Sequence, residues 1–179
     1  MRIIGGKYKR RVIHPPGNLP VRPTTDLAKE SLFNIISNKI DLKDKVALDL
    51  FSGTGAISYE FASRGCKEVI AVEQNFKCIR FIRDTATELA MESVNPVRSE
   101  VFRFIKMTQR KFDIIFADPP YDLDNLDLIS IEIIKNQLLN PDGWMVIEHP
   151  KVVDLSAQQF FVEHRRYGHV NFSFFQEGT

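Results

Sequence analysis

The sequence predicts an α/β fold in which a mostly parallel sheet is covered by helices on both faces. From Lys45 onward, short apolar runs alternate with stretches of helical periodicity, the order expected of repeated strand and helix units. The runs are apolar at consecutive positions, which is typical of parallel strands buried on both sides. The chain has 179 residues, of which 44% are hydrophobic, and these are enough to build one sizeable core.

The beginning of the chain differs from the rest. Residues 2–6 and 8–13 are β-prone runs on either side of a glycine pair, which predicts a short hairpin. A Pro-rich loop follows, up to Pro23. We therefore expect residues 1–25 to form an arm, and residues 26–179 to form the main domain.

The main domain is expected to open with a helix, for which Thr24, Thr25 and Asp26 are suitable N-cap residues. The apolar face of this helix is formed by Leu32, Ile35 and Ile36. The elements expected next, in chain order, are a strand at 46–51, a helix at 55–64, a strand at 68–73, a helix at 75–91, a weak strand at 97–99, a helix at 101–108, a strand at 113–117, a helix around 126–138 and a strand at 144–147.

The end of the chain departs from this alternation. An apolar run at 160–162 and alternating apolar residues at 170–174 flank Tyr167-Gly168-His169, which predicts an antiparallel hairpin. The parallel sheet is therefore expected to end in an antiparallel pair.

Charge is distributed unevenly along the chain, although the formal net charge is only +1. Residues 1–25 contain no acid, while the remaining residues hold 18 basic and 23 acidic side chains. The basic residues of the arm are Arg2, Lys7, Lys9, Arg10, Arg11 and Arg22. A basic arm on an acidic body favours a polyanionic partner, and a solvated basic face is the alternative.

Several protein classes are disfavoured by the composition. No stretch approaches the roughly 18 consecutive apolar residues of a membrane-spanning helix, and the N-terminus lacks the apolar region of a signal peptide. We expect a soluble, cytoplasmic protein. Cys66 and Cys78 lie twelve residues apart without a partner at metal-ligand spacing, so reduced thiols and no metal site are expected.

A glycine turn provides the first candidate site. The expected strand at 46–51 runs into Ser52-Gly53-Thr54-Gly55, which opens a helix, and ligands of parallel sheets bind at such carboxyl ends. Glycines let the backbone approach a ligand, and the helix N-terminus offers free N–H groups to an anionic group. Glu73 ends the next strand, twenty residues after Gly53, where an acid can accept hydrogen bonds from ribose hydroxyls.

Two classes of cofactor compete for this turn. The nicotinamide dinucleotide pattern needs a small third residue where helix and strand pack, and this chain has Ser58 there. Asp49, before the turn, suits a cationic amino-acid group and suits a pyrophosphate poorly. S-adenosylmethionine carries such an ammonium group and is therefore favoured. A glycine turn without any ligand is the third alternative.

The second candidate site is Asp118-Pro119-Pro120-Tyr121, which follows a buried strand and should project from the same edge of the sheet as the glycine turn. An exocyclic amine of a base is a poor nucleophile because its lone pair is delocalised into the ring. The Asp118 carboxylate and the Pro119 carbonyl could accept both amine hydrogens and free that lone pair. Pro119 and Pro120 stiffen the turn, and Tyr121 offers a ring on which an unstacked base can lie.

Plainer interpretations of these residues remain open. A Pro-Pro turn that ends a strand, capped by Asp118 and covered by Tyr121, is a common structural feature. Glu148-His149-Pro150 ends the strand beside this edge, and by position alone it could belong to the substrate loop, although a simple strand terminus is the plainer interpretation.

The tetrapeptide resembles that of amino-methyltransferases in general. The segments that narrow the resemblance are Met1-Arg2-Ile3-Ile4-Gly5-Gly6-Lys7-Tyr8, Arg22-Pro23-Thr24-Thr25-Asp26, Leu32-Phe33-Asn34 and Tyr167-Gly168. With these segments the chain resembles the RsmD-type small-subunit ribosomal RNA guanine-N2 methyltransferases over nearly its whole length. The resemblance implies a Rossmann-like, class I methyltransferase fold with a seven-stranded sheet, and methylation of a guanine N2 in 16S ribosomal RNA of an assembled or assembling subunit.

The resemblance also implies cofactor residues. For S-adenosylmethionine these are Asp49, Phe51, Ser52, Gly53, Thr54, Gly55, Glu73 and Gln74, with Thr24 and Thr25 near its methionine end. Family members usually hold the adenine amine with Asp or Asn followed by Ala, where this chain has Glu100 and Val101. Glu100 could accept the same hydrogen bond through a longer side chain.

Four functions follow from these observations. The favoured one is RNA guanine-N2 methylation by a monomer, with the arm binding phosphates. Adenine-N6 or cytosine-N4 methylation in DNA or other RNA keeps the chemistry, but a duplex-DNA enzyme needs a sizeable recognition region that 179 residues hardly provide. A nicotinamide-dependent oxidoreductase leaves the tetrapeptide unexplained, and an inert RNA-binding protein would bind no cofactor.

Overall fold

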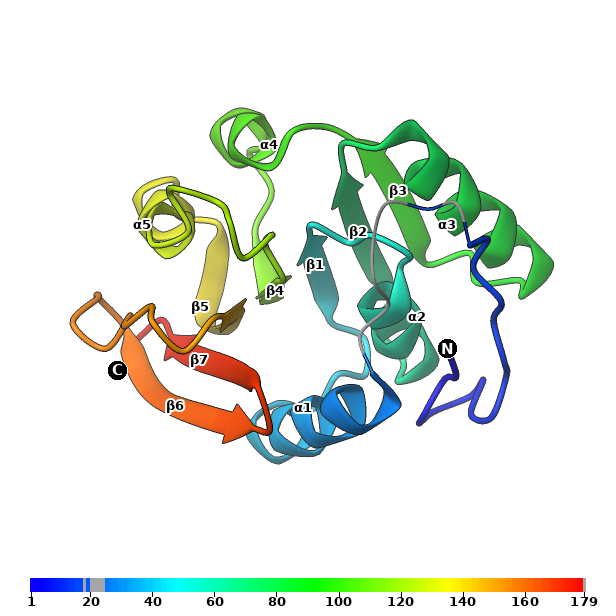
Figure 1. The fold of residues 1–179 in the computed structure, drawn as a ribbon, viewed down its shortest axis with the longest axis horizontal. Coiled ribbons are helices and arrows are strands. Elements are labelled where there is room, and N and C mark those ends of the chain that lie inside the picture. The colour runs from blue at the N-terminus through cyan, green and yellow to red at the C-terminus, as the bar shows by residue number, and fades with distance from the viewer. Residues whose placement is uncertain (18, 20–24, 179) are drawn as a thin grey trace.

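The computed structural model describes residues 1–17, 19 and 25–178, and it confirms the predicted α/β class. One seven-stranded sheet has the strand order β3-β2-β1-β4-β5-β7-β6, with helices on both faces (Figure 1). Its strands are β1 (Val46–Leu50), β2 (Glu68–Glu73), β3 (Val94–Arg98), β4 (Phe112–Ala117), β5 (Leu139–His149), β6 (Phe161–Tyr167) and β7 (Val170–Gln176). The helices are α1 (Asp26–Lys39), α2 (Ala56–Ser63), α3 (Phe76–Glu88), α4 (Val101–Met107) and α5 (Leu128–Lys135).

The pairing of strands follows the prediction. The first five strands pair in parallel, while β7 pairs antiparallel with both β5 and β6. The expected C-terminal hairpin is therefore β6 and β7, and Gly168 takes a φ of 61° in its turn. This antiparallel pair closes one edge of the sheet, and β3 forms the other.

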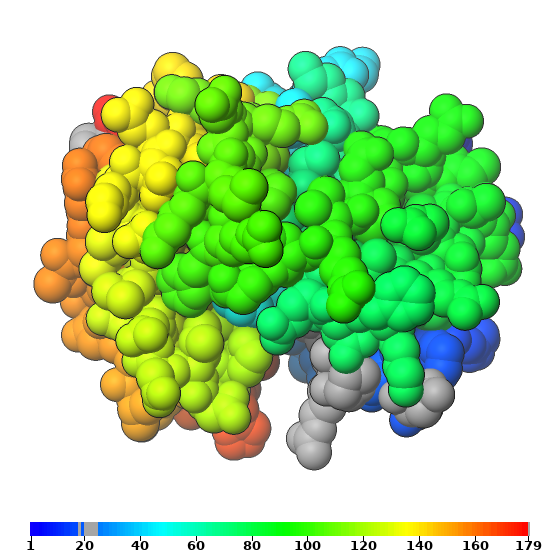
Figure 2. All heavy atoms as spheres, turned by 90° about the horizontal axis from the view of Figure 1, so that it is seen from above, coloured from blue at the N-terminus to red at the C-terminus, as the bar shows by residue number. Residues whose placement is uncertain are grey.

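The sheet separates two hydrophobic cores. Ala47, Val69, Ile114 and Val146 face the core that includes side chains of α1, α2 and α3. Their neighbours in sequence, Leu48, Ile70, Ile115 and Ile147, face the core that includes α4 and α5. Both faces of the central strands β1, β2 and β4 are buried, because successive side chains point to opposite sides and a core covers each side, whereas the edge strand β6 is largely exposed. Seen from above, the helical covering forms a continuous surface, with the N-terminal residues reaching one edge (Figure 2).

Two strands are longer than the sequence predicts. Strand β3 begins at Val94, before the expected 97–99. Strand β5 begins at Leu139 instead of 144, because Leu139 pairs with Phe112 and the register shifts before Trp144 pairs with Ile114. The intervening segment, residues 140–143, has the composition of a turn, and the sheet accommodates it as an irregularity within the strand.

The N-terminal segment packs onto the main domain. Its two β-prone runs pair antiparallel, but through one bridge, between Arg2 and Val12, instead of a full hairpin. Ile3 and Ile13 are buried in the core that α1 and α2 line. Gly6 takes a φ of 73° and lies so close to α2 that an added Cβ would stand 1.8 Å from the Ser63 carbonyl oxygen. Non-local contacts thus fix a segment that looks like an appendage in sequence.

Helix α1 begins where the capping residues predict. Thr25 is its N-cap, and its Oγ1 accepts a hydrogen bond from the Ala28 N–H at 3.3 Å. Arg22 and Thr24, which also belong to the predicted sites, lie outside the described residues. No helix in the described part of the chain is both long and apolar enough to cross a membrane.

Candidate active site

Four acidic side chains lie on one face of the sheet at its carboxyl edge. Asp49, Glu73, Asp118 and Glu148 stand at or just after the ends of β1, β2, β4 and β5. Each acid lies two positions after a strand residue that belongs to the core lined by α1, α2 and α3. Asp49, for example, lies two positions after Ala47. Because strand side chains alternate between faces, all four acids lie on the side of that core. The structure thus brings together the predicted cofactor acids and the predicted catalytic acid.

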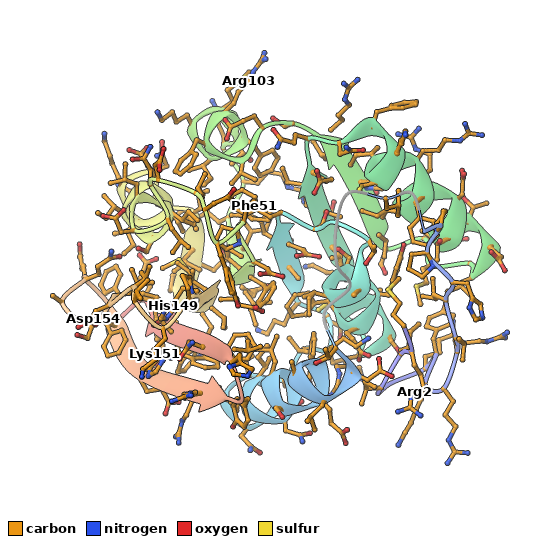
Figure 3. All side chains as sticks on the ribbon, viewed as in Figure 1. Arg2, Phe51, Arg103, His149, Lys151 and Asp154 are labelled. Atoms are coloured by element: carbon orange, nitrogen blue, oxygen red, sulfur yellow. The ribbon has the colours of Figure 1, made fainter. Side chains whose placement is uncertain are left out.

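The glycine turn between β1 and α2 has an unusual backbone. Phe51, Gly53 and Gly55 have φ angles of 60°, 52° and 79°, so the chain turns sharply at the end of β1. Phe51 lies near the middle of the molecule (Figure 3). A Cβ on Gly55 would stand 2.9 Å from Tyr59 Cζ. Only glycine fits this position, and helix α2 begins directly after it.

Asp49 is 1% exposed and is oriented by a neutral donor. The Ser58 hydroxyl, on α2, donates to its Oδ2 at 2.5 Å. Burial raises the pKa of Asp49 to about 7, opposed by hydrogen bonds from Ser58 and assisted by the charge of Glu73. Ser58 entered the sequence analysis only as a departure from the dinucleotide pattern. In the structure it positions an acid of the site.

Glu73 connects the glycine turn to the end of β2. Its Oε2 accepts the Gly53 N–H at 3.1 Å, and its Oε1 accepts the Asn75 N–H at 2.8 Å. Each carboxylate oxygen can accept a further hydrogen bond, so both remain available to hydroxyl donors. The side chain is held in a fixed orientation beside the turn, as a residue that binds a ribose requires.

Asp118 and Tyr121 occupy different environments. Burial raises the pKa of Asp118 well above its usual range, and the negative charges of Glu148 and Asp49 raise it further. Neither oxygen of its carboxylate has a hydrogen-bond partner among the described residues. Tyr121 is 50% exposed, and its hydroxyl donates to Glu148 Oε1 at 2.9 Å. An acceptor without a partner therefore lies beside an exposed aromatic ring.

Glu148 is a component of the site that sequence reasoning undervalued. It is 6% exposed, and its Oε2 is buried without a hydrogen-bond partner. Burial raises its pKa, while the hydrogen bond from Tyr121 lowers it. Its place at the end of β5 was the available signal, but that place does not reveal which face of the sheet the side chain takes.

The predicted adenine-binding residues are positioned by helix α4. Glu100 is the N-cap of α4, and its two carboxylate oxygens accept the N–H groups of Phe102 at 2.9 Å and Arg103 at 2.8 Å. The side chain of Arg103 points away from the body of the molecule (Figure 3). Val101 is buried, whereas Gln74 is exposed at the end of β2. Capping occupies one acceptor position on each Glu100 oxygen, so its contact with an adenine remains a prediction.

The described basic residues of the N-terminal segment lie on the surface. Arg2 pairs with Asp26, its Nε standing 3.4 Å from Oδ2, and Lys7 Nζ lies 5.0 Å from the centre of the Tyr8 ring. The other exposed members, Lys9, Arg10 and Arg11, form no ion pair with a described residue. Arg2 lies on the side of the molecule opposite the end of β5 (Figure 3).

The donor set at the carboxyl edge suits a cationic organic ligand. Within residues 1–17, 19 and 25–178, no group of three histidine, cysteine or acidic side chains has the arrangement of a metal site. Asp49, Glu73, Asp118 and Glu148 form no ion pair with a described cation. A sulfonium and an ammonium group would offset these negative charges, whereas a pyrophosphate would be repelled.

Comparisons with known proteins agree with this geometry. A family model described as "Conserved hypothetical protein 95" matches residues 1–176. The protein named ribosomal RNA small subunit methyltransferase D of Buchnera aphidicola subsp. Baizongia pistaciae is 33% identical over 154 residues, which cover 86% of this chain and 78% of that protein. The chain belongs to the RsmD-type methyltransferase family.

Further members support this family assignment. The protein of the same name from Escherichia coli K12 is 30% identical over 148 residues, covering 83% of this chain and 71% of its own. The solved structure of a hypothetical protein from Thermus thermophilus, TTHA0928, superposes with a TM-score of 0.85 at 26% identity, covering 98% of each chain.

A more distant methyltransferase shares the fold. RsmC of Thermus thermophilus, a 16S rRNA N2 G1207 methyltransferase solved in complex with AdoMet and guanosine, has a TM-score of 0.73 at 19% identity. The superposition covers 92% of this chain and 46% of RsmC. The chain therefore has the Rossmann-like methyltransferase fold that the family resemblance implies.

Proposed function

We propose that this protein transfers a methyl group from S-adenosylmethionine to the exocyclic N2 amine of a guanine in small-subunit ribosomal RNA. One observation carries the proposal: the Asp118 carboxylate, which has no described hydrogen-bond partner, shares a face and an edge of the sheet with Asp49 and Glu73. An acceptor for an amine thus stands beside acids that suit a cationic nucleoside.

The cofactor, when bound, supplies an electrophilic methyl group on a sulfonium. In the proposal Asp49 faces its ammonium group and Glu73 accepts hydrogen bonds from its ribose. The glycine turn fits such a ligand, because it leads directly into the N-terminus of α2, whose backbone N–H groups suit the carboxylate of the amino-acid part. The cofactor would lie against the backbone of this turn, which is formed by Phe51, Ser52, Gly53 and Thr54. The Ser52 hydroxyl donates a hydrogen bond to the Val72 carbonyl at 3.2 Å, which fixes its position.

Asp118 and Pro119 prepare the nucleophile. Asp118 Oδ and the Pro119 carbonyl each accept one amine hydrogen, which draws the nitrogen towards tetrahedral geometry and localises its lone pair. As the new bond between nitrogen and the methyl carbon forms, the bond from that carbon to sulfur would break and leave its electron pair on the sulfur. The methylated amine becomes more acidic and would lose one proton to Asp118 or to water. The raised pKa of Asp118 makes its carboxylate a better proton acceptor than an exposed aspartate. Tyr121 supports the base by stacking.

The RNA substrate is supported by the family and by charge. Two relatives, which are 33% and 30% identical to this chain, carry names that specify the small-subunit ribosomal RNA. The structure of RsmC was solved with guanosine bound. The exposed basic residues of the N-terminal segment would bind phosphates away from the reacting base. A ribosomal substrate places the protein in the cytoplasm, and we propose that it acts as a monomer on an assembled or assembling subunit.

Asp118→Ala and Asp122→Ala form a matched pair of variants that tests the proposal, because Asp122 is an exposed neighbour. With small subunits from a strain that lacks the gene, we expect Asp118→Ala to lower methyl transfer at least about 100-fold while S-adenosylmethionine binding survives. Asp122→Ala should remain active. Nucleoside mass spectrometry of the RNA should identify N2-methylguanosine. Full activity of Asp118→Ala would refute the acceptor role, and binding of NAD instead of S-adenosylmethionine would refute the function.

A further inference from the structure

The Glu148 carboxylate has an arrangement that the methyl-transfer chemistry does not use. Its Oε1 accepts the Tyr121 hydroxyl at 2.9 Å, whereas its Oε2 is buried without a partner. A buried carboxylate oxygen left without a donor costs free energy, which a ligand that supplies a donor recovers. Tyr121 thus fixes the side chain by one oxygen and leaves the other to a ligand.

The register of the sheet places Glu148 beside the amine acceptor. Ala117 of β4 pairs with Ile147 of β5, so the next residues, Asp118 and Glu148, are neighbours across strands about 4.8 Å apart. Both side chains take the same face, since Phe116 and Val146 belong to one core. The charge of Glu148 raises the pKa of Asp118, which agrees with their proximity. A base whose amine reaches Asp118 therefore presents the neighbouring atom of its ring to Glu148.

That neighbouring ring atom differs among the bases. In guanine the N2 amine lies between two ring nitrogens, N1–H, which is a donor, and N3, which is an acceptor. With the N1–H edge towards Glu148, two adjacent donors face two adjacent carboxylates. In adenine the nitrogen beside the N6 amine is N1, and in cytosine the nitrogen beside the N4 amine is N3, and both are acceptors. A carboxylate facing an acceptor is repelled and left without a hydrogen bond, which is an effective way to reject a competing substrate.

We propose that Glu148 is a specificity-determining residue, whose Oε2 accepts the guanine N1–H and thereby selects guanine over adenine and cytosine. The inference rests on the proposed function, because it assumes that Asp118 receives an exocyclic amine. It adds a role for the Tyr121 hydroxyl, which positions Glu148 while the ring stacks on the base.

Guanosine and 2-aminopurine riboside are the probes that test this role, because both carry the 2-amino group while 2-aminopurine has an acceptor at N1. Binding to the full chain with S-adenosylhomocysteine can be followed by NMR titration. The wild-type protein should bind guanosine roughly 10- to 100-fold more tightly than 2-aminopurine riboside. In Glu148→Gln the amide can donate to N1, so this ratio should fall to near one or invert. 2-Aminopurine also lacks the O6 atom of guanine, but this difference between the probes is the same for the wild type and for Glu148→Gln. The change in the ratio between the two proteins therefore reports on N1.

Controls separate the failure of this inference from failure of the proposed function. Glu92→Gln, at an exposed site, should keep the wild-type ratio of the two affinities. An unchanged guanosine preference in a folded Glu148→Gln overturns the role of Glu148. If that variant does not fold, equal binding of the two probes by the wild-type protein overturns it. Methylation of adenine or cytosine instead of guanine by the wild-type protein overturns the proposed function itself.

Discussion

Asp49→Asn should make the protein without cofactor more stable and weaken cofactor binding at the same time. The pKa of Asp49 is raised from 3.8 to about 7 by burial. A difference of about three pKa units corresponds to about 4 kcal/mol of unfavourable free energy once the carboxyl is ionised in the folded state. Asparagine removes this charge and keeps an oxygen for the Ser58 hydroxyl, but its amide hydrogens lack an assigned acceptor, which costs about 1–3 kcal/mol.

The sign of the effect depends on pH. The folded state holds a proton on Asp49 up to about pH 7, whereas the unfolded chain releases it near pH 4. This residue therefore makes the wild-type protein progressively less stable as the pH rises from about 4 to about 7. At pH 8 we expect the free energy of unfolding of Asp49→Asn to be about 1–3 kcal/mol higher than that of the wild type. At pH 4.5 this advantage should be absent, which provides an internal control.

Urea denaturation at both pH values, together with calorimetry of S-adenosylmethionine binding at pH 8, measures both effects. Loss of a charge-assisted contact should raise the dissociation constant about 10- to 100-fold. Below pH 7 the wild-type affinity should fall, because binding then requires the release of a proton. A variant no more stable than the wild type at pH 8 would contradict the cost of the buried charge. Unchanged affinity would contradict the contact with the ammonium group.

Two further predictions concern the N-terminal segment. Lys29→Met should cost about 3–5 kcal/mol in urea denaturation, because it breaks an ion pair whose two side chains are both buried and leaves Glu60 with Arg64 as its remaining described cation. Lys135→Met, at an exposed lysine, should cost under about 1 kcal/mol, and equal losses would contradict this. The second prediction concerns the exposed residues Lys9, Arg10 and Arg11. Their replacement by Gln should lower the slope of log affinity for 16S ribosomal RNA against log salt concentration by about 0.7–0.9 per lost phosphate contact. The control variant Lys135→Gln should leave the slope unchanged. An unchanged slope after replacement of Lys9, Arg10 and Arg11 would exclude them from the interface.

The positions of the functional turns could be predicted from sequence because they follow buried strands. Apolar runs end at Leu50 and Ala117, and the polar residues after them must lie at the carboxyl edge of a parallel sheet. The face that each acid takes could not be predicted. Parallel strands buried on both sides have no alternation of polar and apolar residues, so the sequence does not reveal which side chains share a face. The proposed role of Glu148 therefore rests on the structure and could not be inferred from the sequence.

The N-terminal segment illustrates a second limit of sequence reasoning. Its β-prone runs and Pro-rich loop predict an appendage to the main domain, yet its backbone is bound by residues more than fifty positions away. Ile4 and Gly5 donate N–H groups to the Glu60 carboxylate, and the Lys29 ammonium donates to the Arg2 carbonyl at 2.5 Å. Such non-local contacts leave no periodic pattern in the chain.

Two buried acids in contact with helix α2 show how the fold distinguishes structural charge from functional charge. Glu60, on α2 itself, is neutralised by Lys29 and Arg64 at 3.4 and 3.3 Å, and it also accepts N–H groups from the N-terminal segment. Asp49 is equally buried but has only the neutral Ser58 hydroxyl as side-chain partner among the described residues. A hydroxyl fixes the geometry of the carboxylate without cancelling its charge. The first arrangement compensates a buried charge within the fold, whereas the second leaves a buried negative charge that the proposed cationic cofactor would offset, as expected where a site departs from the rules of stable packing.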